Sequence, residues 1–242
     1  MCNDFLKATA LPESIPIDIR QCFISTVEQI LSQRDSNKYH DSIIRLNHMI
    51  NSSFMVENIC KKTKGINNID LVIGTTSALF HDIFKLFNTG DIIINIKGMD
   101  VKFNISNDDL LEDNHGELGA MFVKSIFNAN KISLNECHTA RICEAIKVHS
   151  DKHDKEYSKT DIQKIVIEAD VIEKIGLTTI LKIFNNKPQL DNTLHSVLSD
   201  KYQKFTSMRD IIVNPYSIEL YENRLNDFYL YIRSIILNKG IK

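Results

Sequence analysis

Residues 69–87, IDLVIGTTSALFHDIFKLF, form the most apolar long stretch of the sequence. Its apolar residues lie nearly all round a helical wheel, which predicts one central helix that is buried on every side. Two ionisable residues, His81 and Asp82, stand side by side within it. Burying both is costly unless a partner compensates them, and a divalent cation is a good partner for imidazole nitrogen and carboxylate oxygen. For this pair alone, the alternative is a hydrogen-bonded core histidine beside a solvent-facing aspartate.

The segments that flank this stretch also show helical spacing. Apolar residues recur at the period of an amphipathic helix after Pro16, and again from Ile43 to Phe54. Further helices are expected near 114–128, 134–149, 159–173, 174–185 and 215–237. The sequence therefore predicts an all-α fold.

One segment, DIIINIKGMDVKFNI at 91–105, breaks the helical pattern. Two β-rich runs flank Lys97-Gly98-Met99-Asp100, and a glycine in a four-residue turn between such runs predicts a β-hairpin. A two-stranded hairpin is marginally stable alone. We therefore expect it to pack on the helical body or on a second subunit, and a homodimer is compatible with it.

Length and composition limit the fold class. The chain has 242 residues, of which 43% are hydrophobic and 25% charged, with only 8 Gly and 4 Pro. Such a chain can bury a substantial core, and its composition argues against an all-β sandwich or long disordered linkers. We expect a single domain, with an N-terminal helical extension over 1–37, a core that carries the site over 38–185, and C-terminal helices over 186–242.

Charge, cysteine content and hydropathy indicate the surroundings in which the protein works. A net charge of −2 provides no field that would steer the chain to nucleic acid. The five cysteines are scattered and contain no CxxC pair, which is typical of reduced thiols. No apolar run approaches the length of a membrane span. We therefore expect a cytoplasmic protein without a membrane partner, and the charge gives no strong signal for nucleic acid.

Two histidines on one predicted helix are candidates for a ligand upstream of the His-Asp pair. His40 opens the helix whose core face carries Ile43 and Ile50, and His48 lies about two turns farther along. His40 is the preferred candidate because it is nearer that apolar face, and His48 is the alternative.

Three more candidates follow the pair. Asp170 lies in the otherwise apolar run IEADVI at 167–172, while His115 and His149 lie in the predicted helices near 114–128 and 134–149. The chain thus presents its candidate ligands in the order H, HD, H, H, D. Side chains that project inward from several helices are the usual way in which an α-bundle builds a metal site, so the whole set favours a metal over the core-histidine alternative.

This pattern resembles the HD superfamily of metal-dependent phosphohydrolases, whose signature is a His, a His-Asp pair and a distant Asp. Within it, the chain is similar to the small bacterial YpgQ-like group. EADVIEKIG at 168–176 resembles that group's DADRLDALG, ALFHD at 78–82 resembles its aaLLHDigk motif, and IKVHS at 146–150 resembles its I..HS. The run 201–228 follows its closing helices, so the resemblance covers roughly 38–236. The chain departs from the family at Phe84, where glycine is usual, and the hairpin looks like an insertion.

The resemblance implies an HD-domain helical bundle with a short inserted hairpin, and a site for one divalent ion (Mn, Mg, Zn, Co or Fe) or two. The ligands that it implies are His40, His81, Asp82 and Asp170. Asp82 could also orient or deprotonate the attacking water. Lys85, one helical turn beyond His81, could meet a substrate phosphate, with a solvated surface lysine as the alternative.

His115 and His149 have three interpretations. They complete a second metal site in which Asp82 bridges two ions, they contact the substrate phosphate, or they are structural.

The activity that the resemblance implies is hydrolysis of a small phosphorylated substrate, with a nucleotide as the leading candidate, as a phosphomonoester or a pyrophosphate, by metal-activated water. The order H, HD, H, H, D also resembles the HD-type oxygenases, which use a diiron centre and dioxygen. A non-enzymatic module that senses a nucleotide or docks a partner is the third alternative. The ligand types do not distinguish zinc, manganese and iron.

Overall fold

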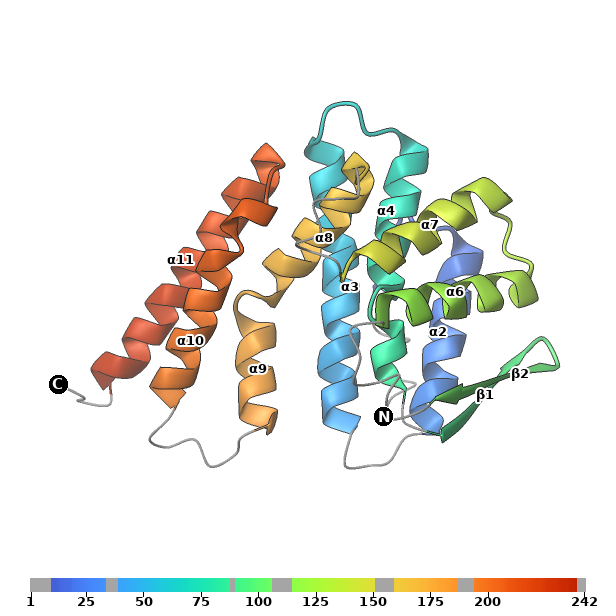
Figure 1. Cartoon of the computed structure of the whole chain (residues 1–242), viewed down its shortest axis with the longest axis horizontal. Coiled ribbons are helices and arrows are strands. Elements are labelled where there is room, and N and C mark those ends of the chain that lie inside the picture. Colours follow the sequence, from blue (N-terminus) through green and yellow to red (C-terminus); the bar gives the residue numbers. More distant parts are fainter. Residues whose placement is uncertain are drawn as a thin grey trace.

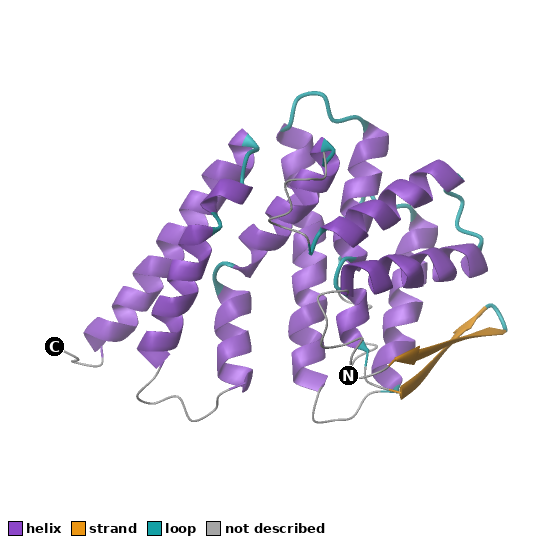
Figure 2. Cartoon of the chain, viewed as in Figure 1, coloured by secondary structure: helices purple, strands orange, loops and turns teal. Residues whose placement is uncertain are grey.

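The fold is almost entirely helical, as the sequence predicts (Figure 1; Figure 2). The computed structural model describes residues 10–33, 39–87, 90–105, 115–150, 159–186 and 194–238. Within these ranges it has nine α-helices, two short 3-10 helices and one two-stranded sheet. The elements are α2 (Ile17–Ser32), α3 (Tyr39–Lys62), α4 (Asn68–Phe80), η2 (Ile83–Leu86), β1 (Gly90–Ile96), β2 (Met99–Ile105), α6 (His115–Asn130), α7 (Glu136–Val148), α8 (Asp161–Lys174), α9 (Leu177–Asn186), α10 (Leu194–Ser207), η3 (Arg209–Ile211) and α11 (Pro215–Asn238).

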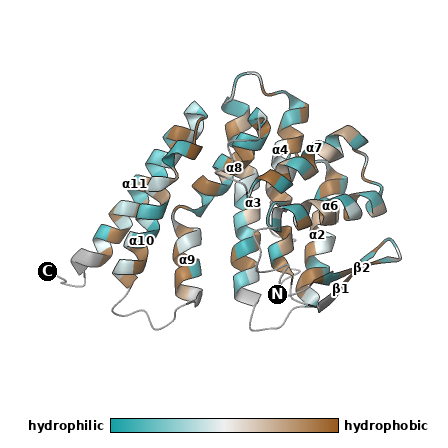
Figure 3. Ribbon diagram, in the orientation of Figure 1, coloured by the Kyte–Doolittle hydropathy of each residue, from teal (hydrophilic) through white to brown (hydrophobic). Residues whose placement is uncertain are grey.

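Helix α3 lies at the centre of the bundle, against α4 on one side and α8 on another (Figure 1). The helices carry both hydrophobic and hydrophilic residues (Figure 3), and their apolar faces meet in one core. Phe80 at the end of α4 packs edge-on against Phe23 of α2 and Phe127 of α6, with ring centroids 5.2 and 5.5 Å apart. Burial of such aromatic rings is among the largest contributions to a core, and here it holds the C-terminal end of α4 in place.

The stretch 69–87 does not form the single helix that its hydropathy predicts. Helix α4 ends at Phe80, His81 and Asp82 follow as a turn, and η2 continues to Leu86. The His81 ring donates a hydrogen bond from Nδ1 to the Ala78 carbonyl oxygen at 2.7 Å, so it pairs one of the carbonyls that a helix end leaves free. Hydropathy missed this break because the residues of η2 are as apolar as those of α4.

Helices α8 and α9 meet at a sharp turn. A capping box between Thr160 and Gln163 begins α8, and Gly176, with φ +109°, redirects the chain after Lys174. An L-residue with a side chain rarely adopts that conformation. The turn therefore sets Asp170, Glu173 and Lys174 in the last turns of α8, with α9 leaving alongside α3.

The hairpin forms where the sequence predicts it, but with a tighter turn. Only Lys97 and Gly98 connect β1 to β2, and their φ values of 50° and 84° are those of the two-residue turn that suits twisted hairpins. Three isoleucines of β1 (Ile92, Ile94, Ile96) are buried. The outer edge of β1 is paired by Gln29 of α2 and by Gln33, which follows that helix, and their side chains bond the main chain of Asn95 and Ile93.

The C-terminal helices α10 and α11 pack on each other, and α11 contacts α8. The joint is polar: one carboxylate oxygen of Glu168 accepts the main-chain N–H groups of Val213 and Asn214, at 2.8 and 3.0 Å, just before α11 begins. None of the helices that the structure describes is both long and apolar enough to cross a bilayer.

Candidate metal centre

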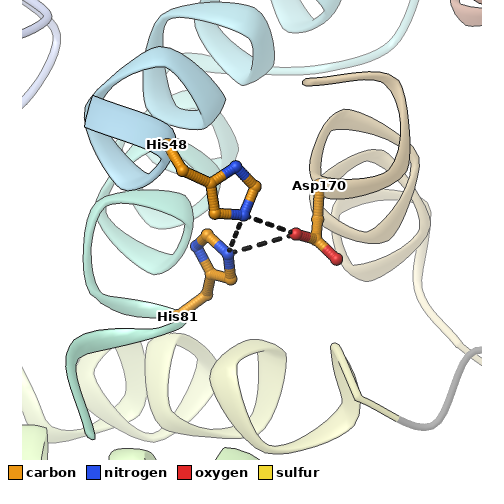
Figure 4. Close-up of side chains that lie close together, drawn as sticks. All are labelled: His48, His81 and Asp170. Carbon is orange, nitrogen blue, oxygen red and sulfur yellow. Dashed lines mark hydrogen bonds and ion pairs between the residues drawn. The ribbon is translucent and has the colours of Figure 1, made fainter. Parts of the chain in front are cut away.

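Three helices bring His48, His81 and Asp170 together in the interior (Figure 4). His48 comes from the middle of α3, His81 from the end of α4 and Asp170 from α8. His48 Nε2 lies 2.9 Å from Asp170 Oδ1 and 3.2 Å from His81 Nε2, and His81 Nε2 lies 3.2 Å from the same oxygen. All three residues are at most 1% exposed. Residues that are 33 to 122 positions apart in the sequence therefore place three donor atoms within one small volume.

His149 repeats the local arrangement of His81. It caps the C-terminus of α7, and its Nδ1 donates to the Ile146 carbonyl oxygen, as the His81 Nδ1 does to Ala78. In each ring the Nδ1–H is used on the helix end, so that Nε2 of the neutral ring is left as the electron-pair donor. The helix ends therefore set both the tautomer and the direction of these two side chains.

Asp82 lies between two groups of histidines. Its Oδ2 is 3.8 Å from His81 Nε2 and 3.9 Å from His48 Nε2. Its Oδ1 is 3.3 Å from His149 Nε2 and 3.7 Å from His115 Nε2. The Nε2 atoms of His115 and His149 are 3.2 Å apart. One oxygen of the Asp82 carboxylate thus faces His48 and His81, and the other faces His115 and His149.

This donor set fits a divalent cation. The Nε2 atoms of two imidazoles lie 3.2 Å apart twice, at His48–His81 and at His115–His149, and a cation can bind the lone pairs of both rings of such a pair. Ligands about 2.1 Å from one ion are separated by about 3.0 Å along an octahedral edge and about 3.4 Å along a tetrahedral one. The separations of 2.9 to 3.3 Å lie close to these values, and the Asp82 oxygens stand somewhat farther off, 3.7 to 3.9 Å from the Nε2 atoms of His115, His81 and His48. The buried His and Asp groups could therefore hold a divalent metal.

The charge states suit ligation near neutral pH, because ligands must be deprotonated. Burial lowers the pKa of His81 to about 4, although Asp82 and Asp170 oppose the shift. Burial, with Lys85 and His149 nearby, lowers the pKa of His115 to about 3. Burial alone would raise the pKa of Asp82, but His81, Lys85 and the hydrogen bond from His149 hold it well below its ordinary value. Two imidazoles are neutral and the carboxylate between them is ionised.

Lysines lie against the two carboxylates. Lys85 Nζ is 2.7 Å from Asp82 Oδ1, and Lys174 Nζ is 2.6 Å from Asp170 Oδ1. Their side chains are 28% and 26% exposed and His115 is 18% exposed, whereas the other histidines of the cluster are fully buried. The cluster therefore meets solvent on the side of these two lysines and His115. Lys85 is thus part of the cluster, rather than a lysine on a remote surface.

The structure places His48, the alternative first ligand, in the cluster. His40 is the second residue of α3, about 12 Å earlier along the helix axis, and its side chain lies outside the described residues. The preference for His40 assumed one apolar face on α3. The helix has two buried faces, because α4 and α8 cover different sides of it. His48 and Ser52 are accordingly buried, while Phe54, an apolar residue of the same helix, is 38% exposed.

Two residues that contact the cluster, Glu173 and Lys174, were not singled out from the sequence. Glu173 accepts a hydrogen bond from His48 Nδ1, and its other oxygen accepts from Thr178 and Asn51 at 2.7 and 3.3 Å. A charged residue on a helix is usually solvated, and both residues fit that expectation. The available signal was their spacing, since Asp170, Glu173 and Lys174 are three and four residues apart and so share a helix face.

The comparisons with known proteins agree with this geometry. The HD domain family matches residues 45–175, a range that begins after His40 and contains His48 and every other donor of the cluster. No curated protein and no solved structure matched the chain. Because the family match spans more than half of the 242 residues, the chain belongs to the HD domain family.

Proposed function

We propose that this chain is a metal-dependent phosphohydrolase whose substrate is a small phosphorylated metabolite, namely a nucleotide. The observation that carries the proposal is Asp82, which faces a group of donors with each oxygen and has Lys85 beside it. HD domains are generally metal-dependent hydrolases. We assign His48, His81, Asp82 and Asp170 as the ligands of one ion, and Asp82, His115 and His149 as those of a second.

When bound, a divalent ion would lower the pKa of water and offset charge on a phosphoryl oxygen. The chain's own residues supply the rest. Asp82 stays ionised at neutral pH, so its Oδ1 can orient a water molecule by accepting a hydrogen bond from it. Lys85 meets the substrate as a point charge. His115, on the solvent side, is the donor that the substrate reaches first. The imidazole-rich donors favour Mn, Fe, Co or Zn over Mg, which prefers oxygen.

The first experiment measures the metal content of protein purified without chelators, and then the release of phosphate or pyrophosphate from a nucleotide panel. We expect two ions per chain in the wild type, and a loss of one in His115→Ala. His138→Ala is the matched control, because His138 lies on α7, which packs against the helix of His115, but outside the cluster. This variant should keep both ions. Folded, metal-loaded protein that releases no phosphate or pyrophosphate from any nucleotide would contradict the proposal.

The same two donor groups would also suit an HD-type diiron oxygenase, since one oxygen of Asp82 faces each group. Two irons per chain, with a spectral change that depends on oxygen, would favour this activity over hydrolysis. An Asp82→Ala variant that stays folded and loses all activity would exclude a purely nucleotide-sensing module. The partly exposed Lys85 and Lys174 beside the cluster favour a phosphorylated substrate, as in the leading proposal.

A further inference from the structure

The two edges of the β-hairpin have different surroundings. On β1, the main-chain N–H and C=O groups of Ile93 and Asn95 point away from β2. The side-chain amides of Gln29 and Gln33 bond these groups at 2.7 to 3.3 Å, so they take the place of a neighbouring strand. The outer edge of β1 is therefore closed within the chain, where the hairpin lies beside α2 (Figure 1).

The outer edge of β2 has no such cover. In the register of the hairpin, Lys102 lies opposite Ile93. Asp100 lies opposite Asn95. Opposite residues of an antiparallel pair either bond each other or both point outward, so the main-chain groups of Asp100 and Lys102 point away from β1. Among the residues that the structure describes, β2 pairs with no strand but β1, and no side chain bonds these outward groups.

The charges along this open edge fit a second copy of the same strand. An open strand edge is a template for another strand, and two strands related by a two-fold axis pair antiparallel. For a register centred on the charged segment, the axis passes at Asp100, Val101 or Lys102. An axis at either charged residue sets like charges opposite each other, which is destabilising. An axis at Val101 sets Asp100 opposite Lys102 of the second copy, and does so twice.

We propose that β2 pairs with β2 of a second copy about Val101, so that two hairpins form one four-stranded sheet. Asp100 and Lys102 are exposed and lie on one face of this sheet, where they form the two opposite-charge pairs. On the other face, the half-buried Val101 meets its symmetry mate, and the two marginal hairpins support each other. The dimer does not depend on the proposed function, because β2 contributes no residue to the candidate metal centre.

The test is sedimentation equilibrium of the full chain from about 1 μM to about 1 mM, since an interface of one strand per chain is small and its affinity low. Lys102→Glu and Asp100→Lys each set like charges opposite each other in both pairs, so each should raise the dissociation constant about 10-fold or more. The double variant Asp100→Lys/Lys102→Glu exchanges the charges and should return it to within about threefold of the wild type. Lys124→Glu, at an exposed lysine of α6, is the matched control and should not change it.

Amide hydrogen exchange at low and high protein concentration tests the strand pairing itself. The amides of Asp100 and Lys102 point outward, so they should exchange fast in the monomer and about 10-fold or more slowly in the dimer. The amide of Val101 bonds β1 and should be slow in both. Circular dichroism and thermal unfolding show that each variant is folded.

Three results would overturn the proposal. A wild type that stays monomeric up to about 1 mM would show that Lys102 only guards the edge against pairing. A dimer that Lys102→Glu does not weaken, or that the double variant does not restore, would use another surface. So would a dimer in which the amides of Asp100 and Lys102 still exchange fast.

Discussion

Helix α8 buries carboxylates on two of its faces, and their surroundings are opposite. Asp170 and Glu173 meet histidines and a lysine of the candidate metal centre. Glu168, 0% exposed, instead accepts two main-chain N–H groups at the start of α11. Burial is therefore the same on both faces, while the partners differ. The difference teaches that a buried acid marks a functional site only where other electron-pair donors converge on it.

The pKa shifts of the buried acids also differ between the metal cluster and the contact of α8 with α11. Burial raises the pKa of Glu168, and Ser217 and the main-chain hydrogen bonds only partly oppose it. In the cluster, neighbouring His81 and Lys85 overcome burial and hold the pKa of Asp82 well below its ordinary value. The pKa of Glu168, which only caps a helix, is thus raised by burial, whereas Asp82 in the cluster is kept ionised by its neighbours.

The largest expected effect comes from removing the first donor of the cluster. His48→Ala should lose bound metal and lower activity by more than the 10- to 100-fold typical of residues behind the ligands, roughly 100-fold or more. His40→Ala, on the same helix, should keep metal content and activity close to the wild type. Elemental analysis and initial rates measure both. Loss of metal in His40→Ala with retention in His48→Ala would reverse the assignment.

A smaller effect is expected at Glu173, which acts through His48. Glu173→Gln keeps a hydrogen-bond acceptor for His48 Nδ1. It removes the negative charge that makes His48 Nε2 a stronger electron-pair donor to a metal. We expect metal affinity to fall about 10- to 100-fold, with the fold retained. Metal titration followed by calorimetry measures this, and Glu144→Gln on α7, outside the cluster, serves as the control. An unchanged affinity would show that Glu173 only packs against His48.

The smallest effect is expected at Glu168, on the other face of α8. Because its folded-state pKa is raised above 4.5, the wild type loses stability as pH rises through the window between 4.5 and that raised value. Glutamine cannot titrate. Glu168→Gln should therefore gain up to about 1 kcal/mol over the wild type at pH 7, and lose that advantage towards pH 4, with metal content unchanged. Urea unfolding at both pH values measures it; a gain that grows on acidification would contradict the assignment.

The sequence by itself determined most of the fold. The helical periods, the low glycine and proline content and the β-rich run at 91–105 were enough for an all-α bundle with an inserted hairpin, because these patterns depend on local preferences. The pair His81-Asp82 and the distant Asp170 were also evident, since ionisable residues in apolar helices are conspicuous.

Only the tertiary structure decided which side chains meet. Periodicity describes one apolar face, so it could not show that α3 is covered twice and that His48 is buried on the second face. It could not show that α4 ends at Phe80, because the apolar residues continue through η2 without a change in hydropathy. The contact of Glu173 with His48 likewise joins two helices far apart in the chain, and a single sequence contains no such contact.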